Sequence, residues 1–411
     1  MYYLIIAILV LDFVIGRVLS MLNASREKLP VPEALTDIYS EEKHKSQTEY
    51  SRANRQLSWF TNSVSLLLML LLLCLGGFRL LDEWVRMWTI GITSELWREV
   101  LMAVLYFVIL GLLEEIMSLP LSAYHSFVIE QRFGFNRSTP ALFLTDWLKT
   151  TALQELLTAV VLSLMVVVYY YLPDWFWLIA WLVVSGISLF ISYFYSQLIV
   201  PLFNKQTRLE DGELRQAIEA FARKVDFPVS DIYVLDSSKR STHANAYFTG
   251  FGKNKRIVLY DSLLQQLSTE QIVAVLAHEI GHNKRHHQPR QLISGLLQTL
   301  LLFFLLSLVL RYDLLSSAIG CEPSLHVNLF LFYIIYSPLS LLLSLLTNYF
   351  SRRHEYEADE FAKQHGQSEA LVSALKRLSV NSLSNPNPHP LFVVFHYSHP
   401  TLLSRIEHLR S

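Results

Sequence analysis

Seven stretches of the chain are apolar and long enough to cross a lipid bilayer as helices, and they constrain the fold more than any other feature. They lie near residues 2–21, 58–79, 100–122, 151–172, 176–200, 291–311 and 326–349. About twenty helical residues cover the roughly 30 Å of hydrocarbon. Only 17% of the 411 residues are charged and 52% are hydrophobic. The sequence therefore predicts a predominantly α-helical, polytopic membrane protein.

Lys and Arg residues predict the orientation of these helices. They are concentrated in residues 22–57, 123–150, 201–290 and 350–411, which share one side if every stretch crosses the bilayer. The opposite loops hold few, namely Arg79, Arg86, Arg98 and Arg311. Because positive loops stay in the cytoplasm, we expect the two large polar regions there and the N-terminus outside. The first stretch lacks a basic start and contains Asp12 and Arg17, so it is expected to be retained rather than removed as a signal peptide.

The segment His278-Glu279-Ile280-Gly281-His282 carries the most informative chemistry. It follows a helix-starting pattern at residues 268–271. On a helix, His278 and His282 lie one turn apart and can bind one metal ion, whereas Glu279 points about 100° away and can reach a water molecule. A motif this short arises by chance in roughly one chain in a hundred of this length, so a plain buried helix is the alternative.

A hydrolytic zinc site needs a third protein ligand and an open position. We predict Glu355, because the sixth and seventh stretches form an antiparallel pair that returns residues 351–363 to the His278 helix. Asp359, one turn later, would accept the distal N–H of a ligand histidine and orient its ring. By spacing alone, a solvated helix face paired with nearby arginines is equally consistent.

Four other histidines are weaker candidates. His286 extends the same helix face, but three consecutive ligands followed by Pro289 are unfavourable. His287 and His365 are expected to be solvated. His399, in the segment Ser398-His399-Pro400, has a pattern typical of a surface residue.

The polar region before the motif predicts a small α+β unit. A helix is expected over 211–225 and strands over 231–236, 244–250 and 255–260, with a hairpin turn at 252–255. Acids within the apolar stretches need either a water-filled cavity or partners on other helices, and the sequence leaves both open. They are Asp12, Glu114, Glu115 and Glu155. No disulfide and, at a net charge of -1 without basic runs, no nucleic acid partner is expected.

Together these segments resemble the type I CAAX prenyl endopeptidases, integral-membrane zinc metalloproteases of the gluzincin type. The matching segments span most of the chain: residues 46–50, 125–130, 134–136, 245–251, 255–259, 278–282, 355–359 and 399–405. The resemblance implies seven transmembrane helices around a water-filled intramembrane chamber, closed by a cytosolic α+β metalloprotease domain with one Zn²⁺ per chain.

The resemblance also implies roles for individual residues. The metal ligands would be His278, His282 and Glu355. The catalytic base would be Glu279, the acid that orients a ligand would be Asp359, and a transition-state-stabilising histidine would be His399. An extended substrate would lie along Asn245, Ala246, Tyr247 and Phe248.

The implied domain organisation follows the chain. Residues 1–200 would hold five transmembrane helices with cytosolic loops, and 201–290 the metalloprotease domain with its sheet and motif helix. Residues 291–349 would form helices six and seven, and 350–411 the rest of the metalloprotease domain with the third ligand.

Implied partners are the bilayer and a peptide or protein cleaved near a C-terminal, commonly farnesylated, CAAX segment. The chain is shorter than eukaryotic members, mainly between the sixth and seventh stretches, and shows no C-terminal dilysine signal. We therefore expect a prokaryotic member in a bacterial inner membrane rather than in the endoplasmic reticulum. A prokaryotic host can lack prenylated proteins, so the natural substrate does not carry over.

Two other functions fit parts of the pattern. A heat-shock-type membrane metalloprotease shares the metal motif and degrades damaged membrane proteins, but it has fewer spans. A transporter or channel with a structural zinc would not need Glu279. An intramembrane protease of the site-2 type is disfavoured, because polar residues at 283–285 follow the motif directly.

Overall fold

The computed structural model describes residues 1–249, 256–312 and 314–411. In this part, 7 helical segments are long and apolar enough to cross a membrane, which confirms the predicted spans. They are α1 (Tyr2–Ser25), α2 (Glu41–Cys74), α4 with its π-helical end (Glu95–Glu130), α5 (Pro140–Tyr171), α6 and α7 with their flanking turns (Pro173–Phe203), α11 (His287–Leu310) and α13 (Leu325–Gln364).

The second helix ends earlier than predicted. It stops at Cys74 rather than near residue 79, because Gly76 adopts the left-handed conformation with a φ of 74°. A side chain at this position would be strained, whereas glycine is not. The chain then turns into a separate amphipathic helix, α3 (Gly77–Thr89).

Two helices also continue well beyond the bilayer stretch. The helix α2 begins at Glu41, where the Ser40 hydroxyl accepts a hydrogen bond from the Lys43 N–H at 3.2 Å. The helix α13 runs unbroken for 40 residues to Gln364. The helix α13 is therefore a single rigid element that connects the membrane part to the polar end of the molecule.

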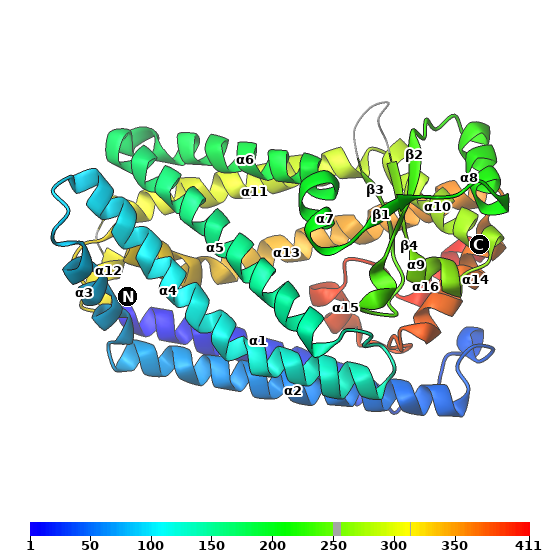
Figure 1. The fold of residues 1–411 in the computed structure, drawn as a ribbon. Coiled ribbons are helices and arrows are strands. Elements are labelled where there is room, and N and C mark those ends of the chain that lie inside the picture. The colour runs from blue at the N-terminus through cyan, green and yellow to red at the C-terminus, as the bar shows by residue number, and fades with distance from the viewer. Residues whose placement is uncertain (250–255, 313) are drawn as a thin grey trace.

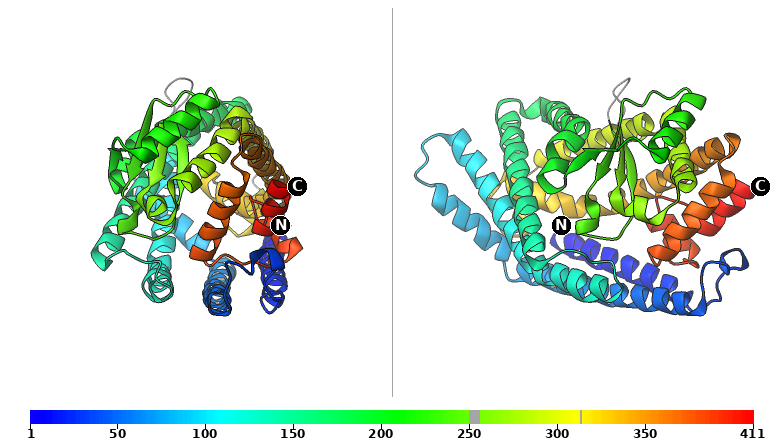
Figure 2. Two further views of the ribbon diagram at one scale, coloured as in Figure 1. Left: turned by 90° about the vertical axis from the view of Figure 1, so that its right-hand side faces the viewer. Right: turned by 45° about the vertical axis from the view of Figure 1, so that its right-hand side comes forward.

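The seven helices surround an intramembrane chamber. Among them, α1 and α2 run side by side along one side of the molecule (Figures 1 and 2). The helix α1 packs on α2 and α13, α4 packs on α5, and α11 packs on α6 and α13. A cavity of about 730 Å³ lies between α1, α2 and the C-terminal region and is lined by Asp12 and Arg17 among others. The N-terminus lies at the end opposite the sheet (Figure 1).

The acidic residues within the membrane helices lie either at a cavity or beside a partner on another helix, the two alternatives that the sequence left open. Asp12 lines the cavity and hydrogen bonds to Ser337 of α13. Glu115 of α4 instead accepts a hydrogen bond from the Trp147 indole of α5 at 3.0 Å. Cavity and helix pairing thus both accommodate charge in the membrane part.

The polar end contains a 4-stranded sheet of order β1-β2-β4-β3. The strands are β1 (Gln206–Arg208), β2 (Asp231–Leu235), β3 (Ala246–Thr249) and β4 (Arg256–Tyr260). The strand β4 is parallel to β2 and antiparallel to β3, which lies at the edge. The three expected strands are present with slightly shorter bounds, β1 was not expected, and the predicted turn at 252–255 lies outside the described residues.

Short helices complete this end of the molecule. They are α8 (Glu213–Lys224), α9 (Asp261–Gln266), α10 (Thr269–Lys284), α14 (Ser368–Asn381), α15 (Pro390–His396) and α16 (Leu402–Arg410). The helix α10 carries the motif and begins with the expected capping box, in which the Ser268 and Gln271 side chains each bond the other's backbone N–H. Apolar side chains of α10 join a core that also includes α8, β4, α14 and α16.

The motif helix α10 touches α13 at a glycine. A Cβ atom at Gly281 would lie 3.0 Å from the Phe361 Cβ and 3.1 Å from the Ala358 Cα. Contacts below about 3.4 Å between carbon atoms are repulsive, so only glycine permits this approach. The close packing holds α10 against the helix that carries Glu355 and Asp359.

We therefore predict that Gly281→Ala lowers the thermal unfolding midpoint and the metal content of the purified protein. The added methyl group must push α10 and α13 apart, and overpacking of this kind costs about 1–3 kcal/mol. Gly295→Ala on α11 is the matched control, because a Cβ atom there would meet no other atom within 4 Å. Equal midpoints and equal metal content for the two variants would contradict the packing argument.

Candidate metal centre

Three side chains converge where α10 meets α13. The Nε2 atoms of His278 and His282 are 3.1 Å apart. A carboxylate oxygen of Glu355 lies 3.4 Å from the first and another lies 3.2 Å from the second. The structure thus brings the three predicted ligands together, with one ligand atom from each within 4.8 Å of the others.

The spacing of these atoms fits a metal ion. A tetrahedral ion with bonds of about 2.0–2.1 Å separates its ligand atoms by about 3.3 Å. The observed separations of 3.1, 3.2 and 3.4 Å lie around that value. The buried Oε2 of Glu355 also accepts no hydrogen bond in the described part of the chain, although a buried oxygen normally has a partner.

Asp359 lies one turn beyond Glu355 and contacts the other nitrogen of His278. Its Oδ1 is 2.8 Å from the His278 Nδ1, so Nδ1–H donates to the carboxylate and Nε2 faces the metal position. Burial and the charge of Arg405 act to lower the pKa of His278, but the neighbouring carboxylates of Asp359 and Glu355 outweigh them and raise it to about 9. A metal ion must displace the proton that this pKa retains.

Arg405 of α16 holds Asp359 in turn. Its guanidinium donates two hydrogen bonds to the carboxylate, at 2.8 and 2.6 Å, and also lies 3.4 Å from Glu355. Arg405 is buried, and its two parallel hydrogen bonds fix the carboxylate of Asp359, which in turn orients His278. Sequence reasoning gave Arg405 no role, because nothing in its local pattern separates it from a surface arginine.

His287 is buried rather than solvated, which corrects the sequence expectation. It is 1% exposed, and its Nδ1 lies 2.9 Å from the Nδ1 of His282. Its Nε2 lies 3.0 Å from a carboxylate oxygen of Glu357. In the arrangement that satisfies both contacts, His282 donates to His287 and His287 donates to Glu357, so the Nε2 of His282 faces the metal position.

The turn at His286 explains why this contact was missed. The backbone of His286 is left-handed, with a φ of 57°, and it separates α10 from α11. The motif helix therefore does not run straight into the sixth span, and the next residue is redirected toward His282. His286 itself is exposed and is not among the grouped ligands. The only local signal would have been Pro289, which disturbs a continuing helix.

Glu279 and His399 lie beside the three grouped side chains. Glu279 is partly buried, and no described residue forms a hydrogen bond with its carboxylate, which leaves it available to a water molecule. The Nε2 of His399 lies 3.3 Å from Glu355, and Ser398 contacts its Nδ1 at 2.9 Å. Its side chain is 63% exposed, so it can also face a substrate.

The edge strand β3 contains most of the predicted substrate segment. Asn245 precedes the strand and its carbonyl accepts a hydrogen bond from the Tyr260 N–H at 3.0 Å. The rings of Tyr247 and Phe248 pack edge-on against Tyr260 and Phe227. These side chains are anchored within the domain, and among described strands only β4 pairs with β3, so its other edge can accept an extended peptide.

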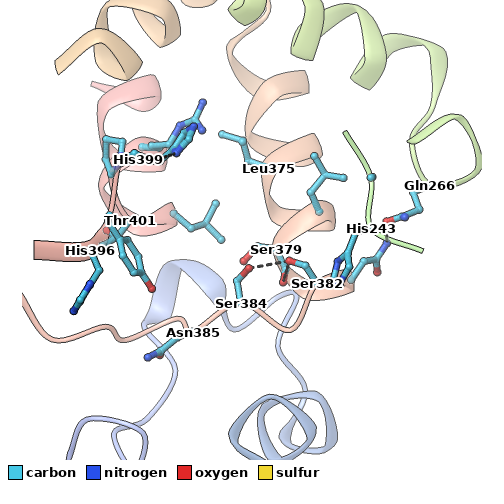
Figure 3. A pocket seen from close by; sticks show the side chains of 18 of the residues that line it. His243, Gln266, Leu375, Ser379, Ser382, Ser384, Asn385, His396, His399 and Thr401 are labelled. Atoms are coloured by element: carbon cyan, nitrogen blue, oxygen red, sulfur yellow. Dashed lines mark hydrogen bonds between the residues drawn. The ribbon is translucent and has the colours of Figure 1, made fainter. Parts of the chain in front are cut away.

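A cavity of about 500 Å³ adjoins this arrangement (Figure 3). His399 lies at one wall and His243 at another, with α14 and the turn after it between them. Arg405 also lines the cavity. The cavity therefore extends from His399 and Arg405, which contact Glu355, to the segment that leads into β3.

Known families match nearly the whole chain. Residues 20–205 match the model of the CAAX prenyl protease N-terminal region with five membrane helices. Residues 208–411 match that of peptidase family M48. The two matches meet close to the beginning of β1.

Individual relatives match the chain along most of its length and belong to the same family. The chain is 35% identical to human CAAX prenyl protease 1 homolog, over 76% of this chain and 74% of the relative. It is 34% identical to CAAX prenyl protease 1 of Saccharomyces cerevisiae, over 93% and 88%. The crystal structure of S. mikatae Ste24p superposes with a TM-score of 0.91 at 32% identity and covers 99% of this chain and 98% of that one.

We predict that His287→Phe weakens metal binding about 10- to 100-fold, the usual effect of removing a partner that orients a ligand. Phenylalanine retains the ring packing against His354, with centroids 4.2 Å apart, but cannot accept a hydrogen bond from His282. Competition with a chelator, followed by metal analysis, measures the change. His44→Phe, near the start of α2, is the control. Unchanged retention of metal in His287→Phe would show that His287 does not orient His282.

Proposed function

The chain belongs to the M48 peptidases named CAAX prenyl protease 1 and is an integral-membrane metalloendopeptidase, and from this premise we propose that it cleaves peptides with a zinc ion held by His278, His282 and Glu355. The observation that carries the proposal is the convergence of these three side chains, whose donor atoms are separated as the ligands of one metal ion would be. Two imidazoles and one carboxylate are a donor set typical of hydrolytic zinc. When bound, the ion supplies Lewis acidity toward the peptide carbonyl and lowers the pKa of water.

The residues around the ligands have three further roles, namely proton transfer, stabilisation of the oxyanion and orientation of the ligands. Glu279 takes a proton from the attacking water and returns it to the leaving amine. His399 donates a hydrogen bond to the oxyanion as it forms. Asp359 and His287 hold the two ligand imidazoles with Nε2 toward the metal.

The substrate proposed is a peptide or protein with a C-terminal CAAX segment, prenylated or not. The names of the relatives support it, since they are CAAX prenyl proteases. The edge strand β3 would hold the peptide backbone extended, with Asn245, Ala246, Tyr247 and Phe248 along it.

We further propose that the site faces the cytoplasm of a prokaryotic cell. The Lys and Arg residues on the side of the sheet support this orientation, and so does the position of the N-terminus at the opposite end (Figure 1). A heat-shock-type protease with fewer spans fits less well, because five membrane helices match the CAAX protease N-terminal model. A transporter with a structural metal leaves the available carboxylate of Glu279 unexplained.

We predict that Glu279→Gln keeps its metal but loses cleavage by at least about 10²-fold, because an amide cannot accept the water proton. Mass spectrometry of products from farnesylated and unprenylated C-terminal peptides in detergent measures the loss and identifies the bond that is cut.

Glu270→Gln is the matched control, since Glu270 lies exposed in the first turn of the same helix. It should cleave at the parent rate. Cleavage by Glu279→Gln at that rate would remove Glu279 as the base. Cleavage by the parent protein that survives complete removal of metal would overturn the zinc proposal.

A further inference from the structure

A groove of about 520 Å³ lies between α2 and α4, at the end of the membrane part that bears the sheet. Most of its lining is apolar, with Leu57 and Phe60 on α2 facing Leu121 on α4. Pro120 also lines the groove and interrupts the backbone hydrogen bonding of α4 there. The π-helical turn His125–Glu130 follows soon after. The surface of α4 is therefore irregular where it faces α2, which leaves room between the two helices.

This groove, called the α2–α4 groove below, faces the bilayer rather than the chamber. Successive residues of an α-helix are about 100° apart around its axis. On α2, the groove residues Ala53, Leu57 and Phe60 therefore lie roughly opposite Ser58 and Asn62, which line the chamber cavity. Phe60 is large and apolar and yet 59% exposed. Exposed apolar side chains that adjoin a membrane span are expected to contact lipid.

A cation lies at the end of the groove that is farther from the bilayer centre. Arg132 lines the groove and donates a hydrogen bond to Glu49 at 2.9 Å. Side chains of 63% and 44% exposure form this pair, so it contributes little stability. The contact uses one nitrogen of a guanidinium with five N–H donors. Because helical side chains lean toward the N-terminus of their helix, Arg132 points back along α4 toward the membrane.

The chamber side of the same helix junction is held by polar contacts. Tyr50 of α2 donates a hydrogen bond to Glu130 at 2.6 Å, and the Nε2 of His125 lies 3.0 Å from the Oδ1 of Asn54. On the bilayer side, Arg132 is the only described groove residue whose side chain hydrogen bonds from α4 to α2. An apolar chain in the groove would fill the space on that side and stabilise the junction through packing.

We propose that the α2–α4 groove binds one glycerophospholipid, with an acyl chain between the two helices and the phosphate at Arg132. The apolar walls match the chain, and the cation at one end matches the anionic phosphate. The depth also matches, because the second apolar stretch begins near residue 58 and the third ends near residue 122. The hydrocarbon boundary therefore crosses the groove, and Arg132 lies beyond it at the level of the lipid headgroups.

Photo-crosslinking tests the location and the chemistry of this site. A phosphatidylglycerol that carries a diazirine in one acyl chain is added in equimolar amount to delipidated protein in detergent. After irradiation, mass spectrometry of peptides should find the label concentrated in residues 53–60 and 120–133. A diacylglycerol with the same chains but no phosphate should label these segments about tenfold less, since it lacks the charge-assisted contact. Label spread evenly over the membrane helices, or equal labelling by the two lipids, would overturn the proposal.

Variants assign the phosphate contact to one arginine. Arg132→Gln should reduce labelling of the groove by phosphatidylglycerol about tenfold and leave labelling by diacylglycerol unchanged. Arg52→Gln is the matched control, because it removes an exposed cation of α2 that does not line the groove. It should label like the parent protein. Unchanged labelling in Arg132→Gln, or an equal loss in Arg52→Gln, would overturn the assignment to Arg132.

A second set of variants tests the position of the acyl chain. Ala53→Phe fills the groove from α2 and should reduce labelling by both lipids. Val128→Phe narrows it from α4 and serves the same purpose if Ala53→Phe does not fold, as judged from its thermal unfolding midpoint and metal content. Leu67→Phe, at an exposed position of α2 outside the groove, should label like the parent. Full labelling in a folded groove variant would overturn the proposal.

Competition identifies the occupant. An excess of phosphatidylglycerol without the diazirine should abolish labelling of the groove, whereas the same excess of a farnesylated peptide should leave it in place. The groove lies on the face of α2 that points away from the chamber cavity, so a substrate in the chamber would not reach it. Equal displacement by the farnesylated peptide would assign the groove to the isoprenoid of a substrate and overturn the phospholipid proposal.

Discussion

The contact between α10 and α13 is the constraint on which the candidate metal centre depends. The helix α13 begins in the membrane and carries Glu355 and Asp359 after it leaves the apolar stretch, whereas α10 carries the two histidines. Gly281 lets the two helices approach so closely that a Cβ atom at this position would lie only 3.1 Å from the Ala358 Cα. The membrane part thereby sets the position of one ligand relative to the others, because α13 is continuous across the boundary.

A charge network at this contact is buried and mutually dependent. Asp359 is fully buried and is bound by both His278 and Arg405. Removing one partner of such a buried pair leaves an uncompensated charge and costs about 3–5 kcal/mol. The network therefore fixes one orientation for His278, and the cost of rearranging it keeps this candidate ligand positioned before any metal binds.

The sequence predicted much of the fold and the core of the site. The seven apolar stretches were recognisable because a bilayer demands length and low charge, which are local properties. The strands at 231–236 and 255–260 were recognisable from their β-branched residues, whereas the three-residue β1 was too short to show a pattern. His287 was misjudged because a left-handed residue, His286, redirects the chain toward the motif.

The sequence by itself determined the spans, the motif helix and the meeting of the polar regions at one end of the helices. Periodicity, spacing and length are properties of short stretches of sequence, so they can be recognised without the tertiary structure. Only the tertiary structure decided which distant groups complete the centre. Arg405 reaches Asp359 across 46 positions, and Glu130 reaches His243 across 113. Such contacts follow from how helices and strands pack, and no local pattern in the chain records them.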